Sequence, residues 1–167
     1  MRTARLVALL AILVAGCASS PGPTGAAADG PGATPFEQRG LDLANGARGS
    51  AALRPVAFAA DLLALARAHC ADMNARHYLD HTTPDGKALG DRLREAGIRC
   101  SAAGENVALV RSDDPAGRAH ELWMRSDGHR RNILNPAFAE CAVAVLRSSD
   151  AEGYYFLTEV FVTRDPS

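Results

Sequence analysis

The sequence predicts an α+β fold in which helices cover both faces of a small, mainly antiparallel sheet. Two observations carry this prediction. Helical periodicity recurs along most of the folded part, and strand-like segments close the chain. The last segment, 154–162, is apolar on both faces, whereas a strand packed on one side alternates apolar and polar residues. Such a strand needs cover on both sides, so we expect an α/β/α sandwich.

The N-terminal part of the chain has the pattern of an export segment. An apolar run too short to span a bilayer follows Arg2 and Arg5, as in secretory signals. The small residues before Cys17 resemble the lipobox of bacterial lipoproteins, which implies removal of a signal peptide, 1–16, and acylation of the cysteine. The alternative is ordinary export with cleavage nearby. The lipidated Cys17 opens a linker, 17–33, whose Gly, Pro and Ala content predicts flexibility.

The folded domain, 34–167, opens with a helix. Thr34 is the expected N-cap, Pro35 occupies the first helical position, and Glu37 completes a capping box. We expect this helix to end near Gly49. A second helix is predicted at about 61–76 by an apolar stripe at helical spacing, consisting of Leu62, Ala66, Cys70 and Met73.

The rest of the chain alternates turns, helices and strands. Pro-Asp-Gly predicts a turn, Gly97 ends a short helix, and Asp114 caps another helix whose first residue is proline. The expected elements are a turn at 82–86, a helix at 87–96, a strand at 101–110, a helix at 115–124, a helical turn at 129–134, and strands at 141–146 and 154–162 joined as a hairpin.

Charge and motifs argue against several classes of protein. The chain has 18 Lys and Arg against 19 Asp and Glu, without the basic surplus of a nucleic-acid-binding protein. His120-Glu121 nearly begins the H-E-x-x-H helix of zinc proteases, but Met124 stands where the second histidine is needed. The sequence also lacks the G-x-S-x-G elbow of α/β-hydrolases.

Three cysteines remain beside Cys17, and export permits a disulfide. Cys100 and Cys141 each lie at the start of a predicted strand, so we predict that they pair if any bridge forms. Cys70 falls in the buried stripe of the second helix and is expected to act as a small apolar residue.

Polar residues stand at three unusual places. His81 follows a helix, Glu105 interrupts a strand, and His129 follows a glycine at a helix break. Two histidines and a carboxylate can hold zinc with an open position, or form an acid/base cluster. On spacing alone, each histidine more readily satisfies a nearby backbone group.

Five motifs occur together in the order of one known family. They are LANGAR at 43–48, HTTPDG at 81–86, GEN at 104–106, WMRSDGHRRNIL at 123–134 and VF at 160–161. Over about 36–162 the chain resembles the CAP superfamily of cysteine-rich secretory proteins, antigen 5 and pathogenesis-related 1 proteins, also called the SCP domain. The short bacterial members are the most similar.

The resemblance implies the same sandwich and a cavity where two histidines and two acids meet, which binds Zn²⁺ or another divalent cation in some members. Ser126 stands where fuller members carry the second acid, and Glu121 and Asp127 do not match that position. We therefore expect weaker metal binding than at a four-ligand site. The matching residues, which are both the candidate metal ligands and the candidate catalytic residues, are His81, Glu105 and His129.

Other motif residues are expected to be structural. Asn106 and Asn132 are expected to bond backbone groups, and Asn45 and Arg48 to serve as structural polar residues. Trp123 is expected to belong to the core.

The predicted function is that of a CAP-domain lipoprotein of the bacterial cell envelope, held by its lipid anchor. Ala18 follows the acylated cysteine in place of the Asp of an inner-membrane retention signal, which favours the outer membrane in a cell with two membranes. We expect a binding module for a divalent cation, a small lipid or another envelope ligand, and no nucleic-acid partner. A hydrolase that uses His81, Glu105 and His129 to activate water, and a structural protein with a vestigial cluster, are the alternatives, so enzymatic activity stays open.

Overall fold

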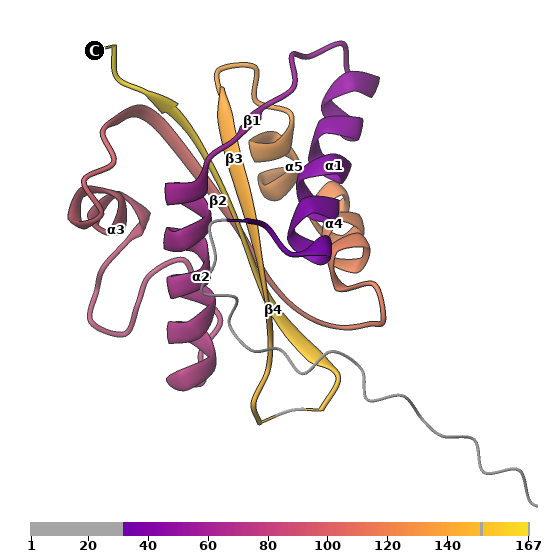
Figure 1. Ribbon diagram of the computed structural model, residues 1–167, viewed down its shortest axis with the longest axis vertical. Coiled ribbons are helices and arrows are strands. Elements are labelled where there is room, and N and C mark those ends of the chain that lie inside the picture. The colour runs from indigo at the N-terminus through magenta and orange to yellow at the C-terminus, as the bar shows by residue number, and fades with distance from the viewer. Residues whose placement is uncertain (1–31, 151, 167) are drawn as a thin grey trace, which may run out of the picture.

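The computed structural model describes residues 32–150 and 152–166. Within this range the protein is a three-layer sandwich (Figure 1), in which α2 and α3 cover one face of a four-stranded sheet and α1, α4 and α5 cover the other. The predicted α+β fold is confirmed. The predicted signal peptide and Cys17 lie outside the described residues. No helix in the described part is long and apolar enough to cross a membrane.

The sheet has the strand order β1-β3-β4-β2, with β4 antiparallel to both β2 and β3, and β1 parallel to β3. The strand that the sequence did not predict is β1, whose two residues are too few to show any periodicity. The helices are α1 (Pro35–Ser50), α2 (Ala60–Ala75), α3 (Leu89–Glu95), α4 (Pro115–Arg125) and α5 (Asp127–Ile133), and the strands are β1 (Ala57–Phe58), β2 (Cys100–Arg111), β3 (Glu140–Arg147) and β4 (Tyr154–Arg164).

The central strand β4 divides the core into two apolar clusters. Phe156, Val160 and Val162 pack toward α2, while Leu157 and Phe161 pack toward α1, α4 and α5. This explains why the strand is apolar on both faces. The predicted stripe of α2 is fully buried in the first cluster and comprises Leu62, Ala66, Cys70 and Met73.

Helix α1 begins as predicted and lies very close to the sheet. The Thr34 backbone N–H donates to Glu37 Oε2 over 2.7 Å, and the Glu37 N–H donates back to the Thr34 hydroxyl. A Cβ at Gly40 would lie 2.7 Å from Val143 Cγ1, so this close approach requires glycine.

Two polar residues of α1 stabilise the neighbouring chain, as expected. Asn45 exchanges two hydrogen bonds with the backbone of Val56, at 3.1 and 2.8 Å. Arg48 is fully buried and donates to four backbone carbonyls, which belong to Arg54, Ile133, Asn135 and Phe138. These bonds join α1 to the segments before β1 and after α5.

The predicted pairing of Cys100 with Cys141 is wrong. Cys141 packs in the cluster beside α1, whereas Cys100 packs against the cluster beside α2. Strand β4 separates them, because Cys141 pairs with Phe161 and Phe161 with Gly104 of β2. Two strand spacings amount to about 9–10 Å, beyond the ~7 Å that a bridge allows. Cys70, Cys100 and Cys141 are all free thiols. The pairing depends on the strand order, which could not be predicted from the sequence and which places β4 between the two cysteines.

Candidate functional site

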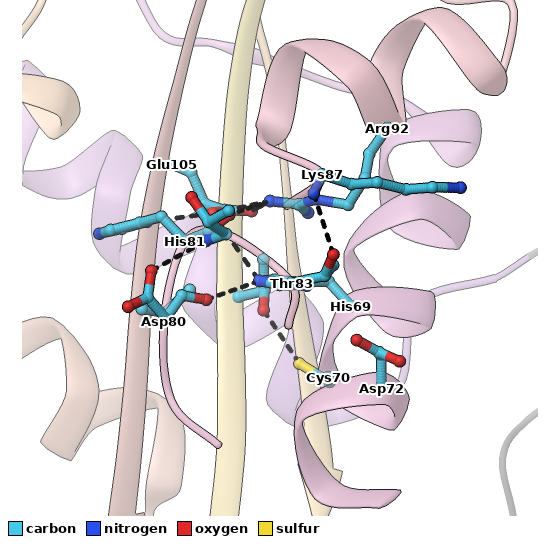
Figure 2. Close-up of polar contacts among 12 residues, drawn as sticks. His69, Cys70, Asp72, Asp80, His81, Thr83, Lys87, Arg92 and Glu105 are labelled. Atoms are coloured by element: carbon cyan, nitrogen blue, oxygen red, sulfur yellow. Dashed lines mark hydrogen bonds and ion pairs between the residues drawn. The ribbon is translucent and has the colours of Figure 1, made fainter. Parts of the chain in front are cut away.

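The structure brings the three predicted site residues together from three elements. His81 lies in the bend after α2, Glu105 in the middle of β2, and His129 in α5. His81 Nδ1 is 3.0 Å from Glu105 Oε1, and the rings of His81 and His129 have centroids 6.3 Å apart. The first of these contacts is drawn in Figure 2.

Strand alternation positions Glu105 and its neighbour Asn106 on opposite faces of β2. Glu105 pairs with Val160 of β4, which faces α2. Asn106 pairs with Glu159, which lies between Leu157 and Phe161 on the face of β4 toward α1, α4 and α5. The Glu105 carboxylate therefore points into the layer of α2 and α3. There its side chain is only 3 % exposed.

The predicted Pro-Asp-Gly turn holds His81 beside this carboxylate. The N–H of Thr83 donates to the Lys87 carbonyl over 3.0 Å, and the Gly86 N–H donates to the Thr83 carbonyl over 2.8 Å. Gly86 has a φ of 83°, which glycine adopts without strain. The His81 side chain is half-exposed, so its ring lies between the buried carboxylate and solvent.

Two further residues complete the cluster. Arg92 of α3 places one nitrogen, Nη2, at 3.0 and 2.9 Å from the two Glu105 oxygens and at 2.9 Å from the His81 carbonyl. His69 of α2 is fully buried, with Nε2 3.0 Å from the Asp80 carbonyl and 3.9 Å from Glu105 Oε1. Figure 2 shows these side chains gathered around Glu105. The sequence analysis missed both residues. Arg92 lies on another helix, and His69 stands next to the buried stripe of α2, so no nearby sequence pattern indicates that either contacts Glu105.

His81 and His129, the two histidines nearest to solvent, have pKa values that shift in opposite directions. The hydrogen bond from His81 to Glu105 raises the pKa of His81, with partial burial opposing it. Burial, and secondarily the nearby charge of His81, lower the pKa of His129. As pH falls, His81 therefore takes up its proton first. The pair offers one donor and one acceptor over the intervening pH range.

The Glu105 carboxylate also sets the orientation of the His81 ring. A neutral histidine that donates from Nδ1 to a carboxylate has a fixed tautomer, with Nε2 left as the acceptor, and once the ring is protonated Nε2 becomes a donor. This arrangement can bind a polar group through Nε2 or act as a general base.

The residues do not fit the divalent cation that the predicted ligand set implies. A catalytic zinc site needs three protein ligands, but Glu105 already accepts hydrogen bonds from His81 and Arg92. The described residues include no group of three or more His, Cys, Asp or Glu side chains arranged to hold a metal. Neither unmatched acid supplies the missing ligand, because Glu121 pairs with Arg118 and Arg125, and Asp127 pairs with Arg130.

Beneath the site, a network of amides connects Glu105 to β4. Asn132 Nδ2 donates to the Glu105 carbonyl over 2.9 Å and to Asn106 Oδ1 over 2.8 Å. Asn106 Nδ2 donates to the His129 carbonyl and, over 2.7 Å, to Glu159 Oε2. Both amides bond backbone groups, as expected. Glu159, which the sequence analysis did not single out, is fully buried, and this burial raises its pKa to about 8.

Trp123 and His120, on α4, lie away from this cluster. Trp123 is 2 % exposed and donates from Nε1 to the Val107 carbonyl at the outer edge of β2, so its predicted core position is confirmed. His120 lines a separate hollow of about 510 Å³ together with residues of α1, among them Leu43 and Ala47.

A sandwich with this strand order, and a His-Glu-His cluster beside its edge strand, defines the class to which the chain belongs. The model of the family described as "CAP: Cysteine-rich secretory protein family" matches residues 41–162. The chain is a member of this family, as the motif resemblance predicted.

Two curated relatives come from Bacillus subtilis. The chain is 34% identical to the uncharacterized protein YkwD of Bacillus subtilis over 113 residues, 68% of this chain and 43% of YkwD. It is 34% identical to the uncharacterized membrane protein YlbC of the same organism over 131 residues, 78% of this chain and 35% of YlbC. The chain thus spans less than half of either curated relative.

A solved structure shares the fold. It is an extracellular protein containing an SCP domain from Bacillus anthracis, with a TM-score of 0.66 and 32% identity. The match covers 77% of this chain and 40% of that one.

Proposed function

We propose that this protein is an exported, lipid-anchored binding module of the bacterial cell envelope. Cys17 is the anchor, because it ends a signal-length apolar run behind small residues. The family relatives include an extracellular protein and one named as a membrane protein, which supports a position at the envelope. In a cell with two membranes, Ala18 after the cysteine favours the outer one.

The observation that carries the binding proposal is the half-exposed His81 ring, held at 3.0 Å by a buried carboxylate and facing His129. Burying an ion-paired carboxylate costs desolvation energy. Here that carboxylate orients an imidazole that solvent can reach, which is how proteins position a histidine that binds a ligand. The pair presents a donor and an acceptor to solvent. This suits a ligand with a polar head, such as a small lipid or another envelope component.

A second candidate is acid/base hydrolysis, which the same His81–Glu105 contact favours. His81 Nε2 would take a proton from water, Glu105 would hold the ring and stabilise its charged form, and His129 would orient the substrate. This candidate predicts turnover, whereas the binding module predicts a stable complex.

The test expresses the full chain in a bacterial host and compares membranes of the wild type and Cys17→Ser after a carbonate wash. The wild type stays with the membrane, and the variant is released. Material extracted from the purified wild type is then compared by mass spectrometry with that from His81→Ala and His129→Ala. His77→Ala is the matched control, because His77 is exposed and pairs with Asp150 away from the site. Retention of Cys17→Ser in membranes, or equal bound material in all variants, contradicts the proposal.

A further inference from the structure

We propose that Arg92 is the built-in cation of this site: it occupies the Glu105 carboxylate and thereby excludes a divalent metal, so that His81 and His129 bind their ligand without one. This inference rests on the proposed function only for the location of the ligand.

The first support is the set of groups that already contact the carboxylate. Glu105 Oε1 lies 3.0 Å from both His81 Nδ1 and Arg92 Nη2, and Oε2 lies 2.9 Å from Arg92 Nη2. Since the carboxylate side chain is 3 % exposed, little of it is left for an ion to approach from solvent. A metal would have to displace the guanidinium or bind beside it.

The second support is the way Arg92 is held in place. Its Nη2 also donates to the His81 carbonyl, and its side chain is only 11 % exposed. Helix α3, which carries it, is fixed by Leu93 in the core and by the Ala88 N–H, which donates to the Asp91 carboxylate over 3.0 Å. All these contacts are made by Nη2, and within the described part of the protein the buried Nε and Nη1 have no hydrogen-bond partner. The guanidinium is therefore held by its burial and by Nη2, and Glu105 is the carboxylate it contacts.

The third support is the charge requirement of a buried carboxylate. An ionised carboxylate in a protein interior needs a cation beside it. Arginine suits this role because its planar guanidinium carries a positive charge and N–H donors that match a carboxylate. In this chain the need is already met by Arg92, and a metal would add a second cation in contact with the same group.

The test titrates the purified full chain with ZnCl₂ at pH 7.5 by calorimetry, comparing the wild type with Arg92→Gln. Removing the guanidinium frees Glu105, and we expect zinc affinity to rise at least tenfold. Adding His81→Ala to Arg92→Gln should abolish the gain, which locates the new site. The matched control is Arg94→Gln on the same helix: Arg94 is 75 % exposed and pairs with Asp91, so its removal changes charge without touching Glu105. It should leave zinc affinity unchanged.

The proposal is overturned if Arg92→Gln, shown by circular dichroism to be folded, binds zinc no more tightly than the wild type. If that variant does not fold, zinc binding by the wild type is the test. A sub-micromolar zinc complex that is lost in both His81→Ala and His129→Ala overturns the proposal. The absence of such a complex upholds it. Neither result bears on membrane anchoring by Cys17, so failure here is distinguishable from failure of the proposed function.

Discussion

Replacing Glu159 by glutamine should remove much of the pH dependence of stability. Glu159 is a fully buried carboxyl on β4 whose Oε2 accepts one hydrogen bond from Asn106, and within the described part of the protein its Oε1 has no partner. Burial raises its pKa from 4.5 to about 8, against the opposing effect of the Asn106 bond. The folded protein therefore keeps a proton that the unfolded chain releases.

The sign and size of the effect follow from this difference. Between pH 4.5 and 8 the folded state binds more protons than the unfolded state, so the free energy of unfolding falls as pH rises. At about 1.4 kcal/mol per pKa unit, the loss reaches roughly 3 kcal/mol at pH 7 and levels off above the folded-state pKa. Below pH 4.5 both states carry the proton, so Glu159 no longer makes the free energy of unfolding depend on pH.

Urea unfolding at pH 5, 7 and 9 measures the effect through fluorescence, because Trp123 is the single tryptophan and is 2 % exposed. The stability of Glu159→Gln relative to the wild type should rise with pH, by roughly 4 kcal/mol between pH 5 and pH 9. Glu152→Gln, at an exposed position, should track the wild type at every pH. If the difference between Glu159→Gln and the wild type does not grow with pH, Glu159 is ionised in the folded protein and the reasoning is refuted.

Three other predictions concern packing and the site. Gly40→Ala should lower the free energy of unfolding by about 1–3 kcal/mol in the same urea assay, because its Cβ would clash with Val143; an unchanged midpoint would contradict the close approach of α1. Arg48→Met should cost roughly 3 kcal/mol or more, because four carbonyls lose their donor, and a loss below about 0.5 kcal/mol would show that water replaces it. In an NMR titration, His81 should protonate at a higher pH than His129, and the reverse order would rule out the Glu105 contact as the dominant influence.

The features that the sequence predicted well are those set by neighbouring residues. The Thr34 capping box, the stripe of α2 and the two apolar faces of β4 are local patterns, and each appears in the structure as expected. The motif resemblance added the long-range information that spacing lacks: it indicated that His81 and Glu105 would meet.

The features that were missed depend on tertiary arrangement. The two residues of β1 form a strand only because β3 lies beside them. The pairing of Cys100 with Cys141 required the strand order, which places β4 between them. Arg92 and His69 reach Glu105 from two different helices, and neither position carries a local sign of this contact.

The central claim is that ligands bind at the His81–Glu105–His129 cluster, and NMR chemical-shift mapping tests it most directly. The labelled full chain would be titrated with an organic-solvent extract of the producing cell's envelope in detergent micelles, with empty micelles as the reference. We predict shift changes centred on His81, Glu105 and His129, and their loss in His81→Ala. Changes centred instead on the hollow between α1 and α4, around His120, would contradict the claim and move the binding site to the opposite layer of the sandwich.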